Sequence, residues 1–432
     1  MKILYPLLSC SFLLSCDATT EQSALPLPAP IAVDDSFEDE NNDGLENIDD
    51  TLRVLRKVEA TIAFQKERFD QNPRLLTAAS TLIGAYSAKA RLIGSLDPYE
   101  EAISVAERAE EAVPGLGARD AYASLLQTLH RNEKAVALAD ASIANPFTTS
   151  DAKAGLLAIK ASAFWQNGNQ EESQLLYEEA IALHPRPNIH VPFAVMKFEQ
   201  GEIALARSLM DEALAFPQSK RGLFYAWLLL QRGILDLEQG RYTEAADYFS
   251  KANRAMPGWY LVQEHQAEVM VKLGQKERAA ALYEDIIERT QNPEFMDALA
   301  ELYDLSAPEE ALALRAAAKE AYEEMLVRFP EIAYVHAVDH FAHSDPARAL
   351  ILASESVELR PGGAQQNVLA ERYLAVGDLV KAEAAWRLAE ASGYRTHDFH
   401  RVGFEIFSEQ GLEEQAEDQR VKALAINPHA LD

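Results

Sequence analysis

Cysteine is almost absent from this 432-residue sequence. The two cysteines that occur, Cys10 and Cys16, both lie within the first 16 residues. Exported proteins often use disulfide bonds for stability, and a chain with no cysteine after position 16 cannot form one within its folded part. The fold must therefore be stabilised by its apolar core, and the early cysteines are available for other chemistry.

Basic residues are also scarce, since 40 Lys and Arg stand against 68 Asp and Glu, giving a formal net charge of −28. A nucleic-acid-binding protein needs a basic face to neutralise phosphates, and anionic lipid attracts basic segments. We therefore expect no nucleic-acid partner, and membrane contact through a lipid anchor only.

Recognisable catalytic motifs are missing as well. The sequence contains no GxxxxGK[ST] phosphate loop, no GxSxG nucleophile turn, no HExxH zinc motif and no cysteine pair after residue 16. We therefore expect a protein that is not an enzyme and that requires no cofactor.

A periodic pattern of paired helices is present instead, and residues 226–259 show it most clearly. Apolar spacing predicts one helix from about Ala226 to Glu238 and a second from about Thr243 to Arg254. Gly240 permits the turn between them, because glycine tolerates positive φ. Proline at 257 ends the second helix. This stretch therefore predicts a helix-turn-helix unit.

The unit resembles the tetratricopeptide repeat (TPR), which has a 34-residue period and small, aromatic and proline residues at fixed positions. Five positions carry the resemblance: Gly233, Ala245, Phe249, Ala252 and Pro257. Similar units recur along the chain, for example 34 residues after Gly240 at Gly274. The resemblance implies an all-α fold, a right-handed α-solenoid of about ten TPR-like repeats across residues 73–432. Residues 51–72 are predicted to form an N-terminal capping helix.

The first 15 residues resemble a bacterial lipoprotein signal peptide. A single Lys2 precedes an apolar run that ends in Leu-Leu-Ser before Cys16. The resemblance implies that Cys16 is lipidated and that the protein is exported and anchored at the periplasmic face of a bacterial membrane. An ordinary cleaved signal or a short anchor is the alternative.

Residues 16–50 predict an acidic tether, because they combine high charge with few large apolar side chains, a composition typical of disorder. Within it, one stretch has the alternating oxygen ligands of a calcium loop, with candidates Asp39, Asn41, Asp43 and Asp50. Its closing residue is Asp, whereas calcium loops usually close with Glu. A solvated acidic linker is the alternative interpretation.

Three histidines form a second metal candidate. His336, His340 and His343 are spaced by four and three residues, which places them on one side of a helix. In the repeat register, however, His336 and His340 occupy positions that usually pack between helices. Histidines that are satisfied by neighbouring side chains are therefore the competing interpretation.

The concave face of the solenoid is the predicted site of function, because TPR solenoids usually bind their ligands there. By register, the face should be apolar in its middle and charged towards the C-terminal half. The candidates are Trp165, Phe198, Trp227, Leu230, Glu264, Glu268, Glu371, Arg401 and Glu405. The sequence thus predicts a membrane-anchored scaffold that binds a peptide or protein partner and assists assembly of a cell-envelope complex. The alternative is an envelope protein that binds metal or another ligand through the histidines or the acidic loop.

Overall fold

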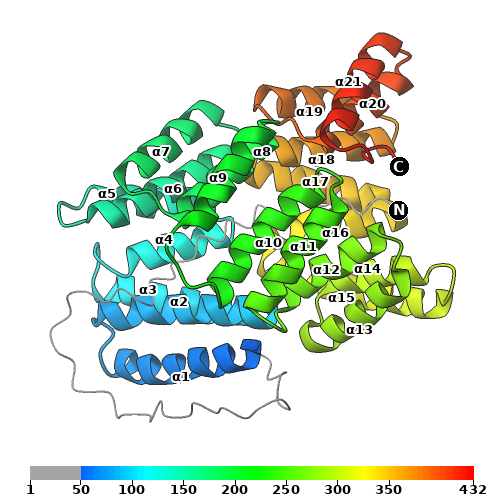
Figure 1. Ribbon diagram of the computed structural model, residues 1–432. Coiled ribbons are helices and arrows are strands. Elements are labelled where there is room, and N and C mark those ends of the chain that lie inside the picture. Colours follow the sequence, from blue (N-terminus) through cyan, green and yellow to red (C-terminus); the bar gives the residue numbers. More distant parts are fainter. Residues whose placement is uncertain (1–49) are drawn as a thin grey trace.

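The computed structural model describes residues 50–432, and every regular element in this range is an α-helix (Figure 1). The helices of the first half are α1 Asp50–Gln71, α2 Leu76–Ile93, α3 Asp97–Ala112, α4 Arg119–Thr128, α5 Asn132–Ile143, α6 Ser150–Gln166, α7 Gln170–Leu183, α8 Pro187–Glu199, α9 Ile203–Ala215, α10 Leu223–Leu237 and α11 Tyr242–Ala255. The remaining helices are α12 Tyr260–Lys272, α13 Lys276–Thr290, α14 Pro293–Tyr303, α15 Pro308–Arg328, α16 Pro330–Ser344, α17 Pro346–Leu359, α18 Gly363–Ala375, α19 Leu379–Ala391, α20 His397–Glu409 and α21 Glu413–Ile426.

Helices α2–α21 form ten consecutive antiparallel pairs, and α1 packs against α2. In Figure 1, α1 and the red α21 lie at opposite ends of the array. The prediction of an all-α solenoid of about ten repeats is therefore confirmed. The stretches 117–150 and 294–329 form the pairs α4–α5 and α14–α15, in which α4 is short, with 10 residues, and α15 is long, with 21.

The pair α10–α11 shows why small residues recur in the repeat. A Cβ atom built on Gly233 would lie 2.4 Å from Cε1 of Phe249, so only glycine fits at this crossing. Ala245 and Phe249 are fully buried between the two helices. Helix α10 begins three residues earlier than predicted, directly after Gly222, which has φ 93°. The five positions that predicted the TPR unit therefore act as packing and turn residues.

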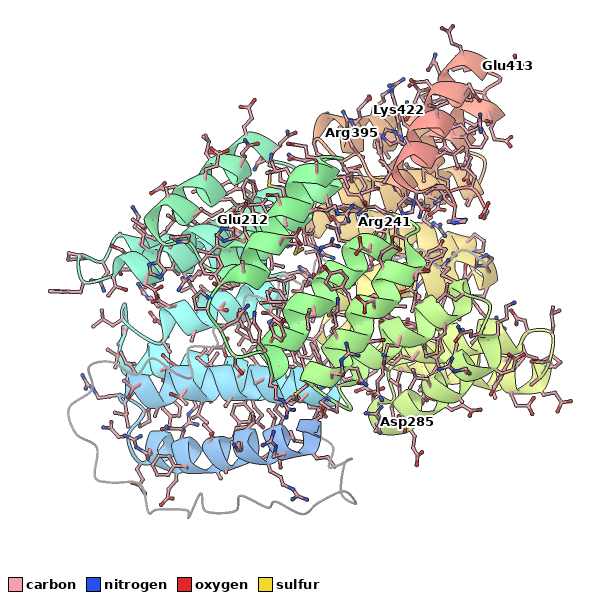
Figure 2. All side chains as sticks on the ribbon, viewed as in Figure 1. Glu212, Arg241, Asp285, Arg395, Glu413 and Lys422 are labelled. Atoms are coloured by element: carbon pink, nitrogen blue, oxygen red, sulfur yellow. The ribbon has the colours of Figure 1, made fainter. Side chains whose placement is uncertain are left out.

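Segments almost 200 residues apart also meet, along a line that we call the seam. The backbone N–H of Gly362 donates to the carbonyl of Gln166 at 2.9 Å, and that of Arg395 donates to the carbonyl of Glu199 at 2.6 Å. Arg395, labelled in Figure 2, lies directly before α20. The repeats around α18–α20 thus lie beside those around α6–α8.

The N-terminal helices make a similar long-range contact. Thr51, in the first turn of α1, donates its hydroxyl to the carbonyl of Pro257 at 2.9 Å. The indole N–H of Trp259 donates to the carbonyl of Arg91 at 3.0 Å. The beginning of the array is therefore fastened to the segment before α12. Among residues 50–432, no helix is both long and apolar enough to cross a membrane.

Candidate functional site

The predicted apolar strip of the concave face is packed inside the protein. Phe198, Trp227 and Leu230 are at most 1% exposed, and Trp165 is 9% exposed. Phe198, Trp227 and Leu230 belong to the main hydrophobic core, because neighbouring repeats cover them. The expectation that these three residues present an open apolar surface is therefore corrected, and any exposed surface of this face must come from other residues.

Charged residues of successive first helices lie close enough to act on one another electrostatically, and we call this row of residues the inner wall. Some of its members are buried, such as Glu264 and Glu268, and others are partly exposed, such as Asp297 and Glu405. The wall runs from α8 to α20 and includes the predicted Glu264, Glu268, Glu371, Arg401 and Glu405. Its acidic members are Glu199, Glu238, Glu264, Glu268, Glu294, Asp297, Glu301, Asp339, Glu371, Asp398 and Glu405. By contrast, carboxylates such as Glu212, Asp285 and Glu413 lie on or beside the outer, second helices (Figure 2).

At the seam, residues of the inner wall connect the repeats around α6–α10 with those around α18–α20. The indole N–H of Trp165 donates to the carboxylate of Glu199, which is 3% exposed. Burial raises the pKa of Glu199 to about 7, against the hydrogen bond from Trp165. One step along, His397 Nε2 lies 3.0 Å from Glu238 Oε2. Although burial opposes a charged imidazole, this contact raises the pKa of His397 above its usual value.

Arg401 organises the C-terminal part of the inner wall. Its guanidinium lies 2.8 Å from Glu371, 2.5 Å from Asp398 and 2.9 Å from Glu405. Burial alone would raise the pKa of Glu371, but Arg401 and Arg372 hold it below its ordinary value. The predicted residues Glu371, Arg401 and Glu405 are therefore brought together in one ion-pair network.

Asp339 on α16 stands beside this network without an ion-pair partner among residues 50–432. Burial raises its pKa to about 8, with only partial compensation from Arg372. A carboxylate that lacks a nearby cation in a desolvated place favours its neutral form. The negative charge of Asp339 is therefore only partly offset by nearby cations of the inner wall.

On α12, the inner wall likewise carries more carboxylates than basic side chains can pair with. Glu264 contacts His265, and this carboxylate raises the pKa of His265 to about 9 against the effect of burial. Glu268 is 3% exposed, and its Oε2 has no hydrogen-bond partner in the described part of the chain. Burial, followed by repulsion from Glu264, raises the pKa of Glu268 well above its ordinary value.

The histidine candidates do not form a metal site. His340 Nδ1 lies 2.9 Å from Asp297 Oδ2, and His336 Nδ1 lies 3.5 Å from Glu294 Oε1. His343 is exposed. No group of three or more His, Cys, Asp or Glu side chains between residues 50 and 432 is arranged to hold a metal ion. His340 is therefore satisfied by its neighbour Asp297, as the competing interpretation expected, whereas His336 makes only the longer contact with Glu294.

Two other predicted features lie outside the described residues. They are the lipidation site Cys16 and the calcium candidates Asp39, Asn41 and Asp43. Asp50 is the first residue of α1, although its side chain is not described. Both features remain predictions.

Sequence reasoning missed several inner-wall residues. Glu294, Asp297 and Glu301 lie on α14, and neither they nor Asp398 are among the sequence candidates. Asp339 lies within the sequence cluster of His336, His340 and His343, but as a metal candidate and not as a residue of this wall. Aligning Pro293 with the starts of the other first helices would have placed the α14 carboxylates, since proline is favoured in the first helical turn.

A pocket of about 430 Å³ lies near the other end of the array, between α3 and the α15–α16 junction. Glu100, Glu107, Arg131, Arg328 and Phe329 contribute to its lining. Arg328 pairs with Asp97 and Glu100, while Arg131 pairs with Glu331. These arginines are engaged in contacts between distant repeats, so the pocket has no free positive charge of theirs to offer a ligand.

The architecture defines an α-helical repeat protein, and one family match specifies the repeat. Residues 236–302 match the family model described as Tetratricopeptide repeat, a region that spans the end of α10 to α14. The match identifies this region as tetratricopeptide repeat, and the ten helix pairs extend the same helix-turn-helix arrangement across α2–α21. No curated protein matches the chain in sequence.

Solved structures with a similar helical arrangement include yeast Tom70, 14% identical, with 87% of this chain and 88% of that chain covered and a TM-score of 0.45. The human IFIT1 dimer with PPP-AAAA is 13% identical, covering 89% and 96% at a TM-score of 0.43. Pseudomonas aeruginosa pilF is 20% identical and covers 54% and 97% at a TM-score of 0.34.

Proposed function

We propose that the protein is a membrane-tethered scaffold that binds a partner protein on the inner wall of its TPR solenoid and assists assembly of a cell-envelope complex. The observation that carries this proposal is the inner wall itself. Successive first helices from α8 to α20 each contribute charged side chains to this row, and Glu238, Asp297 and Glu405 are among its partly exposed members.

Such a wall suits protein binding better than catalysis. Its charged side chains are distributed over several repeats instead of converging on one reacting centre. Extended solenoid surfaces of this kind bind partners through many contacts. The proposal therefore assigns a binding role and no catalytic residue.

The tether in this proposal is the lipid on Cys16, on the periplasmic face of a bacterial membrane. Attachment through more than one acyl chain is stable, whereas a single chain gives marginal binding. The acidic segment after Cys16 would then separate the solenoid from the membrane surface. The high negative charge of the chain disfavours direct contact with anionic lipid.

A comparative pull-down from solubilised membranes tests the function. Wild type and the double variant Glu238→Gln/Glu405→Gln should both be used as bait. Both residues belong to the inner wall and are partly exposed, at 12% and 28% of their side chains. The matched control is Glu171→Gln/Glu172→Gln, because these carboxylates are exposed in the first turn of the outer helix α7.

A scaffold acting through the inner wall should recover a partner with wild type and with the α7 control, but recover much less with the wall variant. Equal recovery by all three baits would move the binding surface elsewhere. Recovery of no partner by wild type under several solubilisation conditions would contradict the scaffold function.

A further inference from the structure

The inner wall has more carboxylates than it has cations to pair with them. The basic side chains near these carboxylates are fewer. They are Lys272, Arg372, Arg401, His265, His336, His340 and His397. Electrostatic complementarity between two surfaces determines which partner is accepted and which is rejected. This wall therefore favours a partner with positive charge.

Most of these basic side chains are already paired inside the wall, whereas Lys272 forms no ion pair within residues 50–432 and acts on Glu268 from a distance. Arg401 contacts Glu371, Asp398 and Glu405. His397 contacts Glu238, while His336 and His340 contact Glu294 and Asp297. Glu268, Glu301 and Asp339 remain without an ion-pair partner within the described range, on α12, α14 and α16 respectively. The unpaired carboxylates thus lie on three consecutive first helices.

Glu268 provides an independent indication of a ligand. It is 97% buried by side-chain contacts, being 3% exposed, yet its Oε2 accepts no hydrogen bond in the described structure. Among the charged groups that act on it, Glu264 and Glu238 repel its negative charge, while His265 and Lys272 attract it and offset this repulsion only in part. A buried carboxylate in this position is stabilised by a positive charge placed against the wall.

The wall is accessible to such a charge. The side chains of Glu294, Asp297 and Glu405 are 17%, 25% and 28% exposed, and Glu301 and Asp339 are partly exposed. A partner that lies along the wall could therefore reach these carboxylates without unfolding a repeat.

We propose that the inner wall takes a basic peptide segment of the partner, whose Lys or Arg side chains pair with the carboxylates of α12, α14 and α16. This proposal rests on the scaffold function and specifies the chemistry of its partner. An extended segment is favoured over a metal ion because the unpaired carboxylates belong to different repeats. The described side chains also form no group of ligands for a metal.

A regular pattern of basic residues suits a row of carboxylates spread over several repeats. A polyproline II segment presents every third side chain to the same side, about 9 Å apart. A basic residue at every third position therefore presents a row of positive charges to the wall.

The first experiment measures binding of a fluorescent synthetic peptide with Lys at every third position and Ser and Ala between, using the full-length protein in detergent. The test variant is Glu301→Gln/Asp339→Asn, and the control is Glu171→Gln/Glu172→Gln on the outer surface. Each double variant removes two carboxylates, so both change the net charge equally. A peptide with Glu in place of Lys tests the sign of the interaction.

The expected result is that Glu301→Gln/Asp339→Asn weakens binding of the Lys peptide by about tenfold or more, as expected for the loss of desolvated charge pairs. The outer control should bind like wild type, and the Glu peptide should not bind. The test variant should also resist thermal unfolding at least as well as wild type, because it removes two partly buried carboxylates that have no ion-pair partner within residues 50–432. If Glu301 and Asp339 had a purely structural role, their replacement would not weaken binding while stability is retained or increased.

Affinity should rise with pH, since burial raises the pKa of Glu301 to about 7 and of Asp339 to about 8. Both groups must ionise to pair with Lys. The charged groups facing them are Asp297, Asp304 and Arg315 for Glu301, and Arg372, Glu371, Asp398 and Arg401 for Asp339. The rise from about pH 6 to about pH 8 should shrink in Glu301→Gln/Asp339→Asn.

Several outcomes would overturn the basic-segment proposal. They are equal loss of binding in the outer control, binding of the Glu peptide, or no binding of the Lys peptide at low salt. A partner recovered in the pull-down that the Lys peptide fails to compete off would also overturn it, while leaving the scaffold function intact. Peptide binding without any recovered partner would instead contradict the scaffold function.

Discussion

His397 Nε2 lies 3.0 Å from Glu238 Oε2, although 159 residues separate them along the chain. The contact joins the beginning of α20 to the end of α10, close to the seam hydrogen bond between Arg395 and Glu199. Distant repeats therefore support one another, in addition to the contacts between neighbours that hold any solenoid together. This arrangement leads to predictions about stability as well as binding.

The close packing at the seam should require glycine, which has no side chain, at position 362. A Cβ atom on Gly362 would lie 2.4 Å from the carbonyl oxygen of Gln166. We expect Gly362→Ala to lower the free energy of unfolding by about 1–3 kcal/mol, because the obstacle is backbone and cannot move freely. Chemical denaturation measures this change.

The control for that experiment is Gly155→Ala in α6. Its new Cβ would lie 2.6 Å from Nη2 of Arg186, the end of a long side chain that can shift more easily than backbone, although it also pairs with Asp151. Replacing glycine by alanine inside a helix usually stabilises it by about 1 kcal/mol. The seam interpretation is contradicted if Gly362→Ala is as stable as Gly155→Ala.

The repeat register predicts a large difference between two alanines on α13. Ala279 is fully buried, whereas Ala281 is exposed. Ala279→Leu should cost about 1–3 kcal/mol through overpacking. Hydrogen exchange should increase mainly in α12–α14, because damage in a repeat array spreads chiefly to neighbours. Ala281→Leu should leave stability and exchange almost unchanged, and a comparable loss there would count against the register.

The buried carboxylate of Glu199 predicts a pH-dependent effect on stability. Burial raises its pKa to about 7 in the folded protein, above the value of an unfolded chain. Between these two pKa values the folded state binds more protons, so this group makes the free energy of unfolding fall as pH rises. Glu199→Gln should therefore gain stability relative to wild type between about pH 5 and pH 8.

Denaturation curves at several pH values test this prediction, because the glutamine can still accept the hydrogen bond from Trp165. Glu171→Gln, at an exposed position on α7, is the matched control and should show no such pH-dependent difference from wild type. A difference between Glu199→Gln and wild type that stays constant with pH would show that Glu199 is ionised in the folded protein throughout the range.

The proposed anchor predicts a specific role for Cys16. Cys16→Ala should release the protein from the membrane fraction or leave its signal peptide uncleaved. Metabolic labelling with a fatty acid provides the measurement. Cys10→Ala is the control and should keep its label, because Cys16 remains available. Label on Cys16→Ala, or none on wild type, would refute the lipoprotein assignment.

The sequence by itself determined the repeating unit. Small residues at Gly233 and Ala245, an aromatic at Phe249 and a 34-residue interval are local requirements of one helix crossing, so they can be read without knowing the rest of the fold. The same register identified Glu264, Glu268, Glu371, Arg401 and Glu405 as residues of the first helices, and the structure places them on the inner wall.

Only the tertiary structure decided how far the array curls and which distant residues meet. A 34-residue period specifies contacts between neighbouring repeats, but small rotations at each repeat accumulate, and their sum brings Glu238 to His397 and Gln166 to Gly362. That curl also buries Phe198 and Trp227 and leaves Glu268 and Asp339 without ion-pair partners in the described chain. Burial and pairing depend on every repeat that packs nearby, and for this reason the sequence pattern of one repeat could not predict them.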